Sequence, residues 1–98
     1  MQPLRLSNPV ADGYFADPFV LRADDAWYAY GTGRDDGGPD RAPGVAFEVR
    51  RSEDFVTWRA VGHALRTPEL PPPSDRAARR TWWAPEVHAW DGRLYLYY

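Results

Sequence analysis

The sequence predicts an all-β fold in which four-stranded antiparallel sheets repeat around an axis, as the blades of a β-propeller do. Helical periodicity is almost absent, and short runs rich in Val, Phe, Tyr and Trp alternate with Gly, Pro and Asp, a pattern typical of half-buried strands. The first predicted hairpin also matches the last when the sequence is shifted by 67 residues, so one structural unit is expected to occur twice.

The first hairpin and the loop after it are expected within residues 19–44. Strands are predicted at residues 19–22 and 27–31, joined by a tight turn at residues 23–25. A Gly-Thr-Gly sequence then opens a loop, and residues 34–44 combine charged residues with Gly and Pro. This loop holds too few apolar side chains to be buried, so it is expected at the surface.

Two further strands, a second loop and a second hairpin are expected after it. Strands are predicted at residues 45–52 and 57–64, on either side of the turn sequence SEDFVT. A polar, proline-rich loop follows at residues 68–80. The last segment, residues 84–98, is predicted to be a second hairpin around an Asp-Gly turn at residues 91–92.

Five identities carry the internal repeat. The matched residues are Pro18, Val20, Asp24, Tyr28 and Tyr30 in the first copy, and Pro85, Val87, Asp91, Tyr95 and Tyr97 in the second. The repeated unit is a strand entered through proline, a turn with Asp, a second strand with Tyr at alternate positions, and two more strands. Compact propeller blades take roughly 40 to 50 residues, so the longer period requires the two polar loops as insertions.

These elements predict the N-terminal part of a single propeller domain. Blade 1 is expected at about residues 16–66, a loop at 67–81 and the start of blade 2 at 82–98. One blade and the first hairpin of the next cannot close a ring, so the 98 residues are expected to be the front end of a larger domain.

Composition and charge exclude several classes of function. A net charge of −2 and a pI of about 5.6 argue against nucleic acid or an anionic membrane surface as a partner, because both attract basic patches. The absence of cysteine excludes disulfides and thiolate chemistry. No apolar run is long enough to span a membrane, and the opening MQPLRLSNPV lacks the apolar core of a signal peptide. A cytoplasmic location is therefore expected, with secretion as the alternative if the true start lies elsewhere.

The repeat places an acidic and an aromatic residue at equivalent points of neighbouring blades. The innermost strands of a propeller line its central channel, and the residues at their entrances gather around the axis at one end. Asp17 and Ala84 are such entrance positions, and Trp83 precedes Ala84. A carboxylate can activate water and an indole gives a sugar a flat apolar surface, so the pair predicts carbohydrate chemistry.

Three sequence elements resemble glycoside hydrolase family 43, and they follow one another in the family's order. They are Asn8-Pro9-Val10 leading to Asp17-Pro18, the segment from Ser52 to Trp58, and Trp83-Ala84-Pro85. The resemblance covers nearly the whole chain. It implies a five-bladed β-propeller enzyme acting on xylosides and arabinosides, of which only blade 1 and the first hairpin of blade 2 are present here.

The resemblance implies roles for two residues. Asp17 stands where the family has its general base, which deprotonates the water that attacks with inversion, and Trp83 stands where the family has an aromatic wall of the sugar subsite. The general acid, a Glu, and a second Asp belong to later blades, so the chain alone is expected to be inactive. Glu86 aligns with Phe19 in the repeat and is expected to be structural rather than a substitute acid.

Each candidate residue also has a structural interpretation. An Asp-Pro pair before a strand is a common turn opening, which applies to Asp17. Thr32 is a candidate for the rim of the sugar pocket, and a turn role between two glycines is equally expected. Trp82 is assigned to packing, as are the tryptophans Trp27, Trp58 and Trp90.

The expected function is that of an inverting glycosidase of the β-xylosidase or α-L-arabinofuranosidase type, with an oligosaccharide as substrate. No cofactor is expected, and no cluster of ligands in the sequence predicts a metal ion. Three alternatives stay open: a non-catalytic carbohydrate-binding propeller, a retaining hydrolase of fructosides or galactosides, and a purely structural propeller. The retaining alternative is disfavoured because Asp17 lies in FADPF, without the Asn-Asp-Pro-Asn run expected of it.

Overall fold

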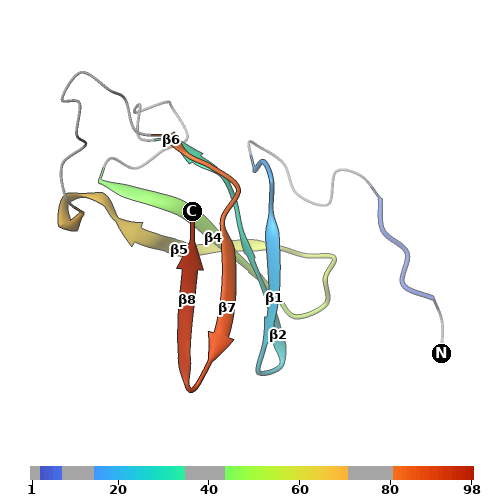
Figure 1. The fold of residues 1–98 in the computed structure, drawn as a ribbon. Helices are drawn as coiled ribbons and strands as arrows, with labels where there is room; N and C mark the ends of the chain where they lie inside the picture. Colours follow the sequence, from blue (N-terminus) through green and yellow to red (C-terminus); the bar gives the residue numbers. More distant parts are fainter. Residues whose placement is uncertain (1–2, 8–14, 35–43, 71–80) are drawn as a thin grey trace.

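A computed structural model describes residues 3–7, 15–34, 44–70 and 81–98 of the chain (Figure 1). Within these ranges the regular elements are β-strands, apart from one short 3-10 turn, η1 (Thr67–Glu69), which confirms the all-β prediction. No helix among them is long and apolar enough to span a membrane. The Asn8-Pro9-Val10 element and most of the two predicted polar loops lie outside the described residues.

Four strands form one antiparallel sheet in chain order. They are β1 (Phe19–Ala23), β2 (Ala26–Tyr30), β4 (Val45–Ser52) and β5 (Arg59–Arg66). Each pairs antiparallel with the next, so the chain runs back and forth across the sheet, as Figure 1 shows. This is the order predicted for the repeated unit, and the predicted bounds of its third strand are the observed bounds of β4.

The two hairpins of the repeat turn in the same way. β7 (Glu86–Trp90) and β8 (Arg93–Tyr97) pair around Asp91 and Gly92, whose φ angles of 48° and 72° are those of a type I′ turn. The β1–β2 hairpin has a two-residue turn beginning at Asp24, whose φ is 54°. β1 ends one residue later and β2 begins one residue earlier than predicted, because this turn holds two residues rather than three, and β2 also ends one residue earlier, at Tyr30.

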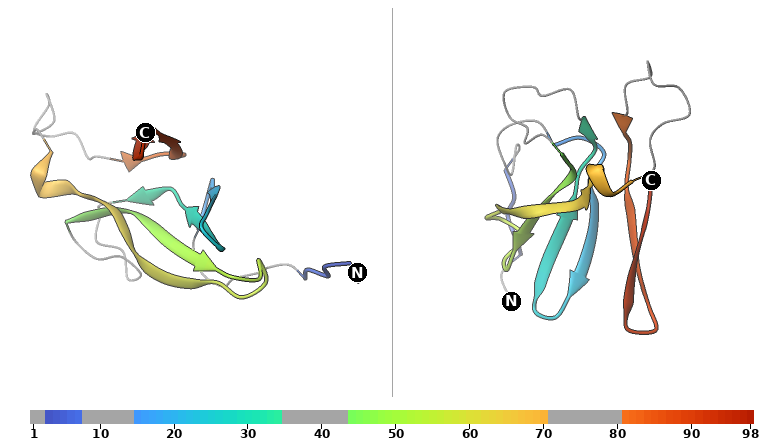
Figure 2. Two further views of the ribbon diagram at one scale, coloured as in Figure 1. Left: turned by 90° about the horizontal axis from the view of Figure 1, so that it is seen from below. Right: turned by 90° about the vertical axis from the view of Figure 1, so that its left-hand side faces the viewer.

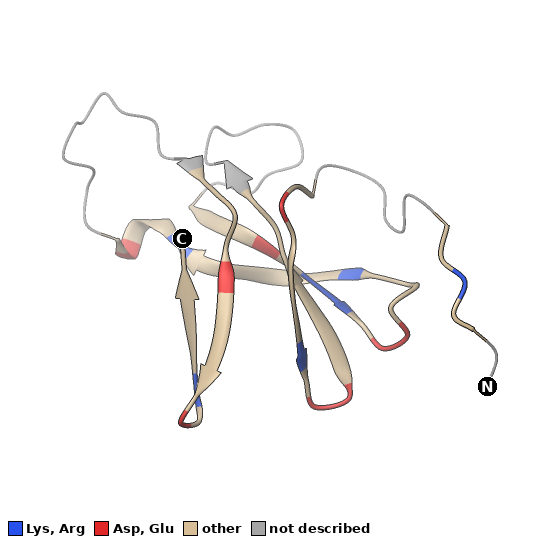
Figure 3. Cartoon of the chain, turned by 45° about the vertical axis from the view of Figure 1, so that its right-hand side comes forward, with Lys and Arg blue, Asp and Glu red and all other residues tan. Residues whose placement is uncertain are grey.

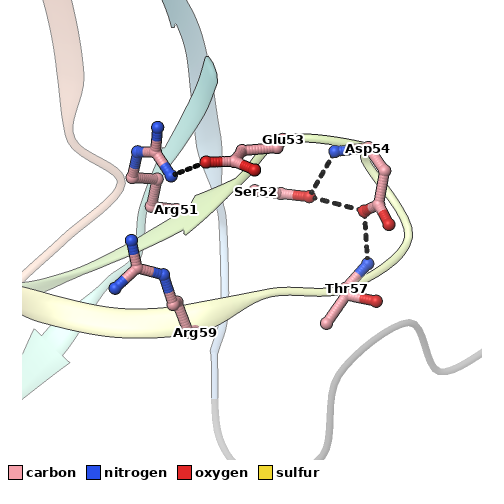
Figure 4. Close-up of a pocket in the computed structure, with 6 residues that line it drawn as sticks. All are labelled: Arg51, Ser52, Glu53, Asp54, Thr57 and Arg59. Atoms are coloured by element: carbon pink, nitrogen blue, oxygen red, sulfur yellow. Dashed lines mark hydrogen bonds and ion pairs between the residues drawn. The ribbon is translucent and has the colours of Figure 1, made fainter. Parts of the chain in front are cut away.

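The fourth strand begins two residues later than predicted, at Arg59 rather than Thr57. The Asp54 carboxylate accepts hydrogen bonds from the backbone N–H of Thr57 (2.7 Å) and of the residue before it (2.8 Å), so these amides bind a side chain instead of a strand. Ser52 Oγ accepts bonds from the N–H groups of Asp54 (3.3 Å) and Phe55 (2.8 Å). Figure 4 shows part of this network, which lengthens the turn.

A short ladder that the sequence does not predict joins two segments expected in loops. β3 (Gly33–Arg34) pairs antiparallel with β6 (Thr81–Trp82). Two residues are too few to show the alternation of apolar and polar side chains by which strands are recognised in a sequence. The pairing ties the segment that follows β2 to the segment that precedes β7.

The core lies where the β7–β8 hairpin and β6 meet the four-stranded sheet (Figures 1 and 2). One buried cluster joins Tyr30 and Val49 of the sheet to Val87 of β7. A second joins the fully buried Phe47 of β4 to Trp82 of β6, with ring centroids 6.1 Å apart. The first unit of the repeat is therefore held to the second by side chains packed between them.

Three of the four tryptophans assigned to packing are confirmed in that role. Trp82 is buried, and the half-buried Trp27 and Trp58 each contact the ring of Phe55 at a centroid distance of 5.2 Å. The prediction for Trp90 is wrong, because this side chain is 72% exposed at the end of β7, beside the hairpin turn. Within the described residues, no side chain buries Trp90 at this tip of the hairpin.

Candidate active site

Asp17 lies directly before β1 in a backbone conformation that few residues adopt. Its φ is 47°, in the left-handed region, and the following residue is Pro18, which restricts the residue before it to extended conformations. Strain of this kind costs roughly 1 to 3 kcal/mol and persists only where neighbouring contacts hold it. Asp17 is exposed, so its carboxylate is accessible to solvent and to a ligand.

Thr32 connects Asp17 with the entrance of the second hairpin. Its hydroxyl donates a hydrogen bond to Asp17 Oδ2 at 3.0 Å and accepts one from the backbone N–H of Ala84 at 2.8 Å. Its own N–H donates to the carbonyl of Ala16 at 2.8 Å. Thr32 itself is only 9% exposed, and its contacts bring three distant segments together.

Ala84 repeats the backbone geometry of Asp17. Its φ is 34°, and it precedes Pro85, which is fully buried. The shift of 67 residues that pairs the two hairpin turns also pairs these two residues. The two entrances that the repeat predicts to be equivalent thus share an uncommon conformation, and one hydroxyl contacts both.

The segment before Asp17 is anchored by the ring of Phe15. The ring lies so close to Gly31 that a Cβ at this glycine would be 2.6 Å from Phe15 Cε2, so only glycine leaves room for it. The Arg50 guanidinium lies 4.3 Å from the ring centroid, and Arg50 Nε donates to Glu48 Oε1 at 2.9 Å. β4 therefore holds the chain two residues before the candidate base.

Trp83 lies on the surface beside these contacts. It is 65% exposed, between the buried Trp82 and Ala84, so most of its indole is accessible to a ligand. Glu86 follows at the start of β7, and its Oε2 lies 3.1 Å from His88 Nε2 of the same strand. Both side chains of this pair are exposed.

A shallow hollow at the β4–β5 turn contains no predicted site residue. It is lined by Arg51, Ser52, Glu53, Asp54, Thr57 and Arg59 (Figure 4). The hydrogen bond from Arg51 lowers the pKa of Glu53, and the backbone N–H groups described above lower the pKa of Asp54.

Acidic residues also stand at the other hairpin turns (Figure 3). In the part of the chain that the structure describes, no three His, Asp or Glu side chains gather to hold a metal ion.

Comparison with known families identifies the fold. The family model described as Glycosyl hydrolases family 43 matches residues 6–98. The chain belongs to glycosyl hydrolases family 43. This family-43 chain is 29% identical over 96 residues to the Beta-xylosidase of Bacillus subtilis (strain 168), and 33% identical over 66 residues to the Xylan 1,3-beta-xylosidase of Vibrio sp.. The alignments cover 97% and 66% of this chain but 16% and 11% of those relatives, so it spans a small part of their length.

A solved structure shows the same fold. The crystal structure of the GH43 BlXynB protein from Bacillus licheniformis matches with a TM-score of 0.66, over 93% of this chain and 16% of that one, at 24% sequence identity. The four-stranded sheet and the second hairpin are therefore part of a β-propeller, as the repeat predicts.

The structure brings the predicted site residues together and adds the residues that hold them. Asp17 and Thr32 are in direct contact, and Trp83 adjoins the residue whose N–H binds Thr32. Sequence reasoning missed Phe15 and Gly31. The only signal for Gly31 is its place directly after a strand, and nothing in the sequence pairs it with an aromatic ring 16 residues earlier.

Proposed function

We propose that this chain is the N-terminal part of the catalytic propeller of an inverting glycoside hydrolase, acting on xylose- or arabinose-containing oligosaccharides. Residues 16–66 form its first blade and residues 82–98 begin the second. Membership of family 43 supports hydrolysis of glycosidic bonds. Both curated relatives are named as xylosidases, which favours xylosides among the substrates.

The setting of Asp17 carries the proposal. It is an exposed carboxylate at a strand entrance, on strained backbone, with one oxygen held by Thr32. The exposed Trp83 adjoins Ala84, whose N–H binds the same hydroxyl. Trp83 and Asp17 are thus linked through Ala84 and Thr32, and we assign the indole to the sugar subsite next to the carboxylate.

Asp17 acts as the general base in this mechanism. Oδ2 accepts the bond from Thr32, and Oδ1 takes a proton from the attacking water. The water oxygen forms the new bond to the anomeric carbon while the bond from that carbon to the leaving oxygen breaks. A general acid on the opposite side protonates the leaving oxygen, so the configuration at the anomeric carbon is inverted.

The general acid is not assigned to this chain. An inverting pair of carboxyl groups stands roughly 6.5 to 9.5 Å apart with the water between them. The repeat aligns Glu86 with Phe19 of β1 rather than with the entrance residue Asp17, so we do not assign it as the acid. We assign the acid to a later blade, so residues 1–98 by themselves are expected to hydrolyse nothing.

The test is Asp17→Asn in the protein translated from the complete reading frame, assayed on an aryl β-xyloside and an aryl α-L-arabinofuranoside. Asparagine keeps the shape but cannot take a proton, so turnover should fall by at least about 100-fold while sugar binding persists. Asp25→Asn makes the same chemical change in the β1–β2 turn and should keep wild-type turnover. NMR of the first product formed from the β-xyloside should show α-xylose.

Three results would contradict parts of the proposal. Undiminished turnover in Asp17→Asn would remove this residue from the base role. A first product with the β configuration would show that the enzyme retains the configuration at the anomeric carbon, which contradicts the proposed inverting mechanism. A wild-type protein that binds xylo-oligosaccharides but cleaves neither aryl glycoside would favour a non-catalytic carbohydrate-binding propeller.

A further inference from the structure

We propose that Thr32 is a positioning residue for the reaction, through a hydroxyl that orients the Asp17 carboxylate and joins it to the segment that carries Trp83. This inference rests on the proposed function and deepens it. Thr32 does not contact the sugar in this view, because its side chain is buried and its hydroxyl is taken up by protein partners. It acts on the substrate only through the residues it holds.

The two hydrogen bonds of Thr32 fix the direction of its hydroxyl proton. A backbone N–H can only donate, so the hydroxyl accepts from Ala84 with a lone pair. Its single hydrogen is donated to Asp17 Oδ2. The bond from the amide polarises the hydroxyl and strengthens its bond to the carboxylate.

The residues that Thr32 joins both need to be held in place. Asp17 and Ala84 have φ angles of 47° and 34° directly before a proline, a conformation that relaxes unless contacts oppose it. The Thr32 hydroxyl binds both the Asp17 carboxylate and the backbone N–H of Ala84, and the Thr32 N–H donates to the carbonyl of Ala16. Loss of the hydroxyl therefore releases the carboxylate and the second entrance together.

Thr32→Val is the variant that isolates the hydroxyl, because valine keeps the β-branched shape and has no polar atom. In the protein translated from the complete reading frame, kcat on an aryl β-xyloside should fall about 10- to 100-fold, the effect of misplacing a catalytic group by about 1 Å. KM should change less than kcat, since the indole of Trp83 is still present to bind the sugar. Thr32→Ser retains the hydroxyl and should restore most of kcat.

Thr57→Val is the matched control. It makes the same substitution at an exposed threonine of the β4–β5 turn and should leave kcat and KM at wild-type values. If Thr32→Val does not fold, Thr32→Cys takes its place, because a thiol is a weaker donor and acceptor of similar size. The cysteine variant should then give a kcat well below that of Thr32→Ser.

The outcomes separate this inference from the proposed function. An inactive wild-type protein, or an Asp17→Asn variant with undiminished turnover, would overturn both. The role of Thr32 alone would be overturned if the wild type is active and Asp17→Asn is inactive, but Thr32→Val keeps a kcat within twofold of wild type. The same kcat in Thr32→Cys, where that variant takes its place, would have the same meaning. An equal loss of kcat in Thr32→Ser would show that the methyl group matters, not the hydroxyl, and would overturn it as well.

Discussion

Gly31→Ala is expected to disturb the candidate active site without altering any group that meets the substrate. A Cβ at position 31 would lie 2.6 Å and 2.7 Å from two carbons of the Phe15 ring. Carbon atoms pack at about 3.5 Å or more, so the ring must move by roughly 1 Å. Phe15 stands two residues before Asp17 and is also in contact with the Arg50 guanidinium, so its displacement carries the candidate base with it.

The magnitude of the effect follows from this overlap. Overpacking of this kind costs about 1 to 3 kcal/mol in the free energy of unfolding. A shift of the base by about 1 Å can cost up to about 100-fold in kcat. Both quantities are measurable in the protein translated from the complete reading frame, the first by urea denaturation and the second on an aryl β-xyloside.

A second substitution separates the clash from other effects of alanine. Phe15→Leu in the Gly31→Ala background removes the ring carbons that the new methyl group meets, so part of the lost stability and kcat should return. Phe15→Leu alone is the matched control and should cost stability by itself. A Gly31→Ala variant with wild-type stability and wild-type kcat would refute the anchoring role of this contact.

Two further predictions concern the sugar wall and the β4–β5 turn. Trp83→Ala should weaken binding of a xylo-oligosaccharide by about 1 to 3 kcal/mol, the scale for burying a large apolar side chain, as measured by titration calorimetry; loss of folding would assign Trp83 to the core instead. The backbone N–H groups of Thr57 and Val56 keep the pKa of Asp54 below its usual value, so its stabilisation is present above the unfolded pKa and is lost as the pH falls through the folded one. Asp54→Asn should therefore lower the urea midpoint at neutral pH, and the gap to wild type should narrow below about pH 4; a gap of constant size at all pH values would contradict this reading.

Strand bounds are predicted correctly where glycine or a polar turn in the sequence coincides with the end of a strand. β4 has its predicted bounds because glycine precedes it and a polar turn follows it. β5 begins later than predicted because the Asp54 side chain binds the amide of Thr57, which the prediction assigns to the strand. The two-residue ladder of β3 and β6 depends on a partner about 48 residues away, and local sequence carries no trace of it.

In the candidate site, the sequence predicts the residues but not the contacts between them. Asp17, Thr32 and Trp83 can be chosen from the sequence, because each stands at the entrance or exit of a predicted strand. The contacts between them cannot, since Thr32 is separated from Asp17 by 15 residues and from Ala84 by 52. Whether a hydroxyl lies on the pocket rim or between two strand entrances depends on how the hairpins pack, which no single segment determines.

The two strand entrances of the internal repeat share one backbone geometry but present different chemical groups. Asp17 and Ala84 share a left-handed conformation before proline, but the first contributes a carboxylate and the second only its backbone N–H. Because Thr32 contacts both, an aspartate at position 84 would bring a second negative charge close to the first. Two carboxylates at one site favour protonation of one of them, and a protonated Asp17 could not act as a base. The alanine at position 84 therefore suits the proposed chemistry, since a residue without a negative charge leaves the single carboxylate ready to accept a proton.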